Sequence, residues 1–217
     1  MDLKIEKTME NLRLNNMKPY YANTKDEVCK IVKDMLFKGA VITAGGSMSL
    51  KESGVWEIME SPEYRFYDRT KPGITDEERL EAFRMAIGCD FFFCSTNAVT
   101  ENGELINVDG NANRISSIAF GPKKVVMIVG VNKIVKDIDE GFLRVKKIAA
   151  PKNGVRLKTG TPCEKTGRCI ALEKNDCPDI TDGCRCKGRM CADYLISAFQ
   201  REKDRINVIF CGENLGY

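Results

Sequence analysis

The sequence predicts an α/β fold, in which a Rossmann-like, mostly parallel sheet is flanked by helices. Residues 124–130 form a continuous apolar run, as in strands that are buried on both faces of a parallel sheet. Predicted strands also alternate along the chain with amphipathic helices, which is typical of a sheet with helical crossovers. The 217 residues suffice for one large domain or for one domain with an appendage.

Apolar spacing and helix caps define the elements of the first half. A helix is predicted over residues 3–17, and a second helix follows Thr24, which with Glu27 has the pattern of a capping box. Residues 40–43 have the composition of a short buried strand that leads into the glycine turn at residues 45–47. The other elements predicted in this half are a strand over residues 64–67, a helix capped by Thr75 and Glu78, and a strand over residues 89–95.

The second half begins with two extended segments on either side of Asn102-Gly103, which is a hairpin signal and predicts an insertion or an edge of the sheet. We also predict an extended segment over residues 115–120 and, after the apolar run, a helix marked by Ile134 and Ile138. A helix over residues 192–199 and a strand over residues 206–211 close the chain. The predicted domains are an α/β core (1–150), a cysteine-rich appendage (151–191) and a helix and strand that complete the core (192–217).

Overall charge gives no reason to expect a nucleic acid or membrane partner, because 34 basic side chains nearly balance 31 acidic ones. The apolar runs are too short to cross a bilayer, and the chain does not start with the pattern of a secretory signal. We therefore expect a cytoplasmic protein. A homo-oligomer is left open.

Ten cysteines and no histidine distinguish this composition. The lack of histidine excludes Ser-His-Asp triads, Cys-His pairs and zinc sites that need imidazole. Acid–base chemistry in this protein would therefore use carboxylates, lysines, tyrosines or thiols.

The glycine turn after the strand at residues 40–43 is a candidate anion site. Gly45 and Gly46 allow a tight turn and close approach of the backbone to a ligand, and Ser47 and Ser49 add hydroxyl donors. The motif is neither a Walker A sequence nor Gly-x-Gly-x-x-Gly, so it specifies no nucleotide. The alternative is a strand-to-helix turn that binds nothing.

Polar side chains follow the strand at residues 89–95, and ligands of open parallel sheets bind beyond the carboxyl ends of strands. Arg114 is the residue most expected to meet a ligand carboxylate or phosphate, and Lys133 can bind an anion or act as a base. Glu101 and Asp109 are candidate catalytic carboxylates, although both lie in sequences that also form turns. Asn97 and Asn113 complete the predicted ligand-binding set, whose partner would be a small anion.

Six cysteines lie close together in the appendage and could bind a metal, either as an iron–sulphur cluster or as zinc. Their gaps match neither zinc ribbons nor ferredoxins, so redox-active thiols and a loop of free thiols remain alternatives. Residues 151–191 carry nine basic and five acidic side chains, a positive excess that would offset thiolate charge. The six are Cys163, Cys169, Cys177, Cys184, Cys186 and Cys191.

Several motifs resemble the LUD domain, the lactate utilisation family once called DUF162. They are residues 43–54 (TAGGSMSLKESG), 94–114 (CSTNAVTENGELINVDGNANR), 120–135 (FGPKKVVMIVGVNKIV), 149–153 (AAPKN), 161–169 (TPCEKTGRC) and 213–217 (ENLGY). The chain resembles the short stand-alone branch, similar to the lactate utilisation protein C group, with a cysteine-rich segment near its C-terminal end. An insertion over residues 170–175 departs from the common cysteine pattern of that branch.

The resemblance implies the fold of ribose-5-phosphate isomerase, glucosamine-6-phosphate deaminase and CoA transferases (the NagB/RpiA/CoA transferase-like fold). It also implies a role in L-lactate oxidation beside iron–sulphur oxidoreductase partners. Residues 100–103 resemble the segment that carries the nucleophilic glutamate of CoA transferases, which would be Glu101. An isomerase or transferase that acts on a sugar phosphate or CoA ester, using Glu101, Asp109 or Lys133, is the second hypothesis, and a non-catalytic assembly subunit is the third.

Overall fold

A six-stranded sheet forms the centre of the molecule in the computed structural model, which describes residues 2–217. Every pair of neighbouring strands in this sheet is parallel. From edge to edge the strands are β1 (Lys18–Ala22), β10 (Ile206–Cys211), β7 (Lys124–Gly130), β4 (Phe91–Cys94), β2 (Val41–Ala44) and β3 (Arg65–Tyr67). The predicted mostly parallel sheet is therefore confirmed.

A second sheet of four strands contains the predicted hairpin. Its two central strands are antiparallel and are joined by the turn that contains Asn102-Gly103. One outer strand is parallel to its neighbour and the other is antiparallel. In order, the strands are β8 (Ile134–Val135), β5 (Ala98–Thr100), β6 (Leu105–Asp109) and β9 (Asp193–Ser197).

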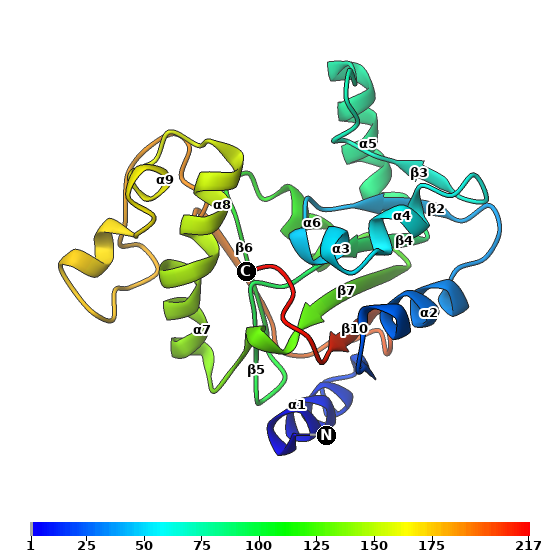
Figure 1. Ribbon diagram of the computed structural model, residues 1–217, viewed down its shortest axis with the longest axis horizontal. Helices are drawn as coiled ribbons and strands as arrows, with labels where there is room; N and C mark the ends of the chain where they lie inside the picture. The colour runs from blue at the N-terminus through cyan, green and yellow to red at the C-terminus, as the bar shows by residue number, and fades with distance from the viewer. Residues whose placement is uncertain (1) are drawn as a thin grey trace.

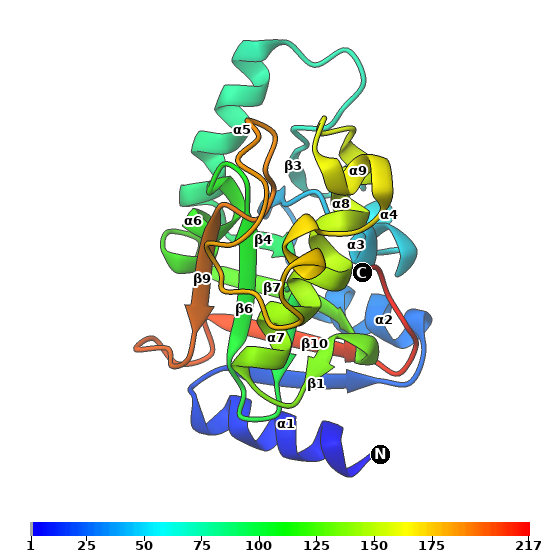
Figure 2. The ribbon, with the colours of Figure 1, turned by 90° about the vertical axis from the view of Figure 1, so that its left-hand side faces the viewer.

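The six-stranded sheet is buried on both faces, because alternate residues of its strands enter two separate cores. In β7, Val126 and Ile128 pack with helices α2 (Lys25–Met35), α3 (Met48–Glu52) and α4 (Val55–Met59). The other face meets α1 (Leu3–Leu14), α5 (Asp76–Gly88), α6 (Asn113–Ala119) and part of the second sheet. Figure 2 shows α1 beneath β1 and α2, α3 and α4 grouped on the opposite side from α6.

Helices α7 (Ile138–Arg144) and α8 (Ala150–Leu157) run on from one another through a π-helical turn and pack against the second sheet. The short helix α9 (Pro162–Thr166) and a 3-10 turn (Ile170–Glu173) follow, and they lie on the far side of α8 from the six-stranded sheet (Figure 1). The last strand, β10, returns to the central sheet between β1 and β7. No helix within residues 2–217 is both long and apolar enough to span a bilayer.

Both capping predictions correspond to real helix starts. Thr75 and Glu78 exchange the two reciprocal hydrogen bonds of a capping box at α5. At α2 the Thr24 side chain accepts from the Glu27 amide, whereas the Glu27 carboxylate accepts from Asn23 N at 2.7 Å, one residue before the cap. The helix predicted from Ile134 starts later, at Ile138, because residues 134 and 135 pair with β5 instead.

The extended segment predicted over residues 115–120 is wrong, because this segment forms helix α6. A carboxylate from the end of β6 caps this helix: Asp109 Oδ2 accepts hydrogen bonds from the backbone amides of Arg114 (2.8 Å) and Ile115 (2.9 Å). Tertiary contact thus satisfies helix-start donors that no local side chain reaches. Burial of Ile118 against the central sheet adds the packing.

The closing helix predicted over residues 192–199 is also wrong, because residues 193–197 form strand β9. All five residues pair with β6 in an antiparallel register that runs from Asp193 opposite Asp109 to Ser197 opposite Leu105. The apolar pattern of this short segment suits either structure, and the free edge of β6 decides between them.

Candidate functional site

A cavity of about 310 Å³ opens where β2, β4 and β7 end. The segments that follow these three parallel strands line one side of it, and the remaining walls come from β6, α6, α8, the segment after β3, Met190 and the last two residues of the chain. Of the described residues that line the cavity, four have cationic side chains and one has a carboxylate. They are Arg69, Arg114, Lys133, Arg156 and Asp109.

The glycine turn, a candidate anion site in the sequence, lies at one wall of this cavity. Gly46, Ser47 and Ser49 line it, whereas Gly45 lies behind it, where a Cβ would come within 3.2 Å of Arg114 Cδ. Glycine at position 45 therefore allows the arginine stem to pack against the turn. Ser47 precedes α3 without capping it, and this helix has five residues.

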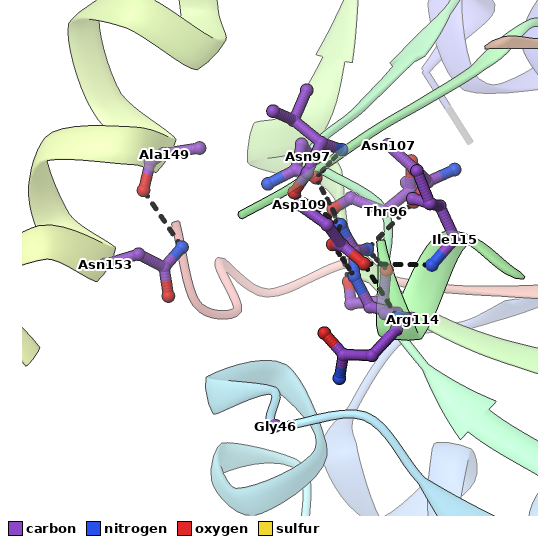
Figure 3. A network of polar contacts seen from close by, with 12 residues as sticks. Gly46, Thr96, Asn97, Asn107, Asp109, Arg114, Ile115, Ala149 and Asn153 are labelled. Carbon is purple, nitrogen blue, oxygen red and sulfur yellow. Dashed lines mark hydrogen bonds and ion pairs between the residues drawn. The ribbon is translucent and has the colours of Figure 1, made fainter. Parts of the chain in front are cut away.

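Arg114 is the centre of a polar network that joins β4, β6 and α6. Its guanidinium donates to Asp109 Oδ1 (2.9 Å), Asn97 Oδ1 (2.7 Å), Asn107 Oδ1 (2.9 Å) and the carbonyls of Ser95 (2.6 Å) and Val108 (3.0 Å). Five acceptors match the five N–H groups of a guanidinium. Arg114, which was predicted to meet a ligand, thus donates all of its guanidinium hydrogen bonds to the protein and connects the segments of the site (Figure 3).

Asp109 is tied into the same network and lies buried at the end of β6. One of its oxygens pairs with the Arg114 side chain, and the other caps α6 through the amides of Arg114 and Ile115. A carboxylate that is held by charge-assisted bonds on both oxygens is suited to positioning rather than to proton transfer. Asn113 lines the cavity beside it, in the first turn of α6.

Lys133 reaches the cavity from the turn after β7, with 3% of its surface exposed. Its Nζ donates to Ser49 Oγ at 2.9 Å and to Ser95 Oγ at 3.0 Å. Burial lowers the pKa of this ammonium group to about 7, and the positive charges of Arg144 and Arg114 add to the fall. Near neutral pH Lys133 is therefore present both as an ammonium ion and as a free amine.

Glu101, the third predicted catalytic residue, lies elsewhere. It is in the hairpin turn after β5, where its carboxylate pairs with Lys7 Nζ at 2.9 Å. Its backbone carbonyl accepts from Asn11 on α1. Glu101 is not among the residues that line the cavity, and its contacts attach α1 to the second sheet.

Two cavity arginines were missed by the sequence reasoning. Arg69 follows β3, where its Nε donates to Ala44 O at 3.4 Å and its guanidinium lies 5.2 Å from the centre of the Phe83 ring. Arg156, on α8, donates to Asn153 Oδ1 at 2.8 Å. The position of Arg69 after a parallel strand was a usable signal, whereas α8 reaches the cavity only through tertiary packing.

Buried polar atoms of Arg156 and Tyr217 face this region. Arg156 Nε and Tyr217 Oη are both buried and meet no protein partner in ideal hydrogen-bond geometry within residues 2–217, and both residues line the cavity. Figure 3 shows Asn153 on α8 across from the Arg114 network, with Gly46 on the turn below them. Burial raises the pKa of the Tyr217 hydroxyl and the Arg156 guanidinium lowers it in part, so these two side chains lie against each other at the cavity wall.

The six clustered cysteines divide into two groups. Cys163, Cys169, Cys184 and Cys191 line a second, smaller cavity, whereas Cys177 and Cys186 are exposed. All ten cysteines are free thiols in the described chain. As they stand, no three Cys, Asp or Glu side chains among residues 2–217 are grouped closely enough to hold a metal ion.

These features define a Rossmann-like α/β protein with a cationic cavity at the carboxyl ends of its strands. The model of the LUD domain matches residues 5–211, so the chain belongs to the LUD domain family, whose members are lactate-utilisation-type proteins. The crystal structure of a DUF162 family protein from Deinococcus radiodurans is similar in fold, with a TM-score of 0.50, 13% identity and 96% of each chain covered.

Two other solved structures resemble about half of the chain. eIF2B beta from Chaetomium thermophilum has a TM-score of 0.38 and 14% identity, and the match covers 53% of this chain and 44% of the eIF2B beta chain. Ribose 5-phosphate isomerase from Plasmodium falciparum has a TM-score of 0.31 and 14% identity, and covers 52% of each chain. No curated protein matches the sequence.

Proposed function

We propose that this LUD domain protein binds a small carboxylate or phosphate in the cavity and thereby supports L-lactate oxidation beside iron–sulphur oxidoreductases. The observation that carries the proposal is the charge of the cavity. Asp109, its acidic side chain, is already paired with Arg114. Arg69, Lys133 and Arg156 take part in none of the ion pairs found within residues 2–217.

An anion in this cavity would meet three cationic groups on three different segments. Arg69 comes from the loop after β3, Lys133 from the turn after β7 and Arg156 from α8. Burial lowers the pKa of Arg69, which shows that its charge is partly removed from water. Charge-assisted hydrogen bonds are stronger where water is excluded, and the guanidinium groups of Arg69 and Arg156, which line the cavity, can donate them.

Removing one of the arginines is expected to weaken anion binding. A hydrogen bond to a charged group contributes about 1.5–3 kcal/mol, so Arg156→Gln should raise the Kd for the bound anion roughly tenfold or more. Isothermal titration calorimetry with L-lactate and with inorganic phosphate, at constant ionic strength, gives the measurement and separates the two ligand classes. Arg69→Gln should have a similar effect.

The matched control is Arg79→Gln, because Arg79 is an exposed arginine on α5 whose ion pair with Asp76 lies outside the cavity. Its Kd values should equal those of the wild type. Failure of the wild type to bind either anion at millimolar concentration would contradict the proposal. Equal loss of binding in Arg79→Gln and Arg156→Gln would contradict it as well.

A second candidate function is favoured by Lys133 alone. A buried amine with a pKa near 7 can take a proton from a carbon beside a carbonyl, as an isomerase or transferase of sugar phosphates or CoA esters requires. The hydroxyls of Ser49 and Ser95 hold this amine in place.

This candidate predicts turnover of an aldose phosphate or an acyl-CoA ester that depends on Lys133. Lys133→Met should lower kcat by roughly 10²–10⁴-fold, the usual range for loss of a general base. Lys136→Met removes an exposed lysine three residues away and should leave kcat unchanged. If the wild type turns over no member of a panel of such substrates, the enzymatic candidate is excluded and anion binding stands alone.

A further inference from the structure

We infer that Cys163, Cys169, Cys184 and Cys191 are the ligands of one thiolate-bound metal centre, separate from the anion cavity. Their side chains line a cavity of about 20 Å³, a space that suits a single ion and not an organic ligand. Its other walls are largely apolar, among them Pro151 and Pro162. Four thiols around one small apolar space match the closed ligand set of structural thiolate sites.

The four cysteines come from two loops that each supply a pair. Cys163 lies in the first turn of α9, and Cys169 follows Gly167, the residue that caps this helix with a φ of 70°, a left-handed conformation that favours glycine. Cys184 and Cys191 lie in the second loop, residues 174–192, which connects the 3-10 turn to β9. Two pairs on facing loops allow tetrahedral ligation without the two-residue spacing that zinc ribbons use.

Cationic side chains fix the second loop and supply charge to the site. Arg189 donates to the carbonyls of Cys191 (2.9 Å) and Cys184 (3.3 Å) as well as to those of residues 180–182. Lys146 is fully buried and donates to the carbonyls of Ile180 and Asp182. Four thiolates and a divalent ion carry about two net negative charges, which these two cations would offset.

The thiols already influence one another. The Cys163 side chain lies close enough to Cys184, Cys169 and Cys191 for charges on these thiols to interact. A metal ion reverses this repulsion between thiolates, since it binds the deprotonated sulphur. The four side chains would have to turn toward one another to bind an ion, because they do not form a ligand set as they stand. Metal binding and local folding are commonly coupled in small metal sites.

The two remaining cysteines of the segment do not complete this cavity. Cys186 is exposed and lies beside Cys184. Cys177 is exposed and lies outside the cavity lining. Cys177→Ser is therefore a matched control, because it removes a thiol of the same segment that takes no part in the proposed site.

The test is metal analysis of the full chain purified without oxygen and without chelators. Zinc, iron and acid-labile sulphide are measured in the wild type, Cys163→Ser, Cys184→Ser and Cys177→Ser. We expect one metal centre per chain in the wild type and in Cys177→Ser. Loss of a residue that only hydrogen-bonds to a metal ligand already costs roughly 10–100-fold in metal affinity, so the two ligand variants should lose at least that much.

The sulphide and the visible absorption spectrum distinguish a single zinc or iron ion on the four thiols, which supports the inference, from an iron–sulphur cluster, which is too large for this cavity and would overturn it. Native alkylation of the wild type, read by mass spectrometry, is independent of whether a variant folds: the four thiols should be protected until a chelator is added, and Cys177 should react at once. Substoichiometric metal with all thiols reactive, a disulfide between two of the four, or equal metal loss in Cys177→Ser would overturn it. Each of these outcomes leaves anion binding by Arg69 and Arg156 unaffected.

Discussion

Arg114→Leu is expected to lower the free energy of unfolding by about 3–5 kcal/mol, the usual cost of removing one partner from a buried ion pair. The substitution leaves Asp109, a residue that is 7% exposed, without its ion-pair partner. It also removes five hydrogen bonds that connect β4, β6 and α6. Urea denaturation followed by circular dichroism provides the measurement.

Arg79→Leu is the control, because it breaks an exposed arginine–aspartate pair within α5. Exposed pairs of this kind contribute about 0–1 kcal/mol, so the difference between the two variants should be several kcal/mol. A double variant, Asp109→Asn with Arg114→Leu, should recover part of the loss since no buried charge remains. Equal destabilisation by Arg114→Leu and Arg79→Leu would show that the Arg114 network does not hold the site together.

Lys133→Met should alter the way in which stability depends on pH. The pKa of Lys133 is about 7 in the folded chain and about 10.4 in an unfolded one. Between these values the unfolded chain binds more protons at this residue than the folded chain, so stability rises with pH. The destabilisation from burying this amine is fully present below pH 7 and is lost as pH rises toward 10.4.

The measurement is the free energy of unfolding of wild type and Lys133→Met at pH 7 and pH 9. Relative to the variant, the wild type should gain about 2 kcal/mol over this interval. The comparison with the variant cancels the titration of thiols and tyrosines that both proteins share. Lys136→Met, in which an exposed lysine is replaced, is the control. An identical pH dependence in wild type and Lys133→Met would mean that the Lys133 amine is not held in a water-excluded site.

The sequence predicted the central sheet well because its strands are continuous apolar runs that both faces bury. Residues 124–130 and 206–211 form strands with the predicted bounds. Prediction failed where a distant partner decides the structure. Helix α6 depends on a cap from Asp109, and β9 depends on the free edge of β6. Neither partner can be found from local propensity, which gives a weak preference for such short segments.

The same distinction applies to the candidate site. Lys133 and the glycine turn were predicted because they follow parallel strands, and the structure brings them to one cavity. Arg156 was not predicted, because it lies on α8, a helix that does not directly follow a strand of the central sheet and reaches the cavity only through tertiary packing. Arg114 also lines this cavity. The sequence could not show that all five of its guanidinium N–H groups donate to protein acceptors.

Met190 belongs to the walls of both cavities, the cationic one and the one lined by thiols. Helix α8 also contributes to both, with Pro151 at one and Arg156 at the other. A ligand in either cavity would therefore contact a side chain that borders the other. Thermodynamic reciprocity requires that any change in anion affinity caused by a metal be matched by an equal change in metal affinity caused by the anion.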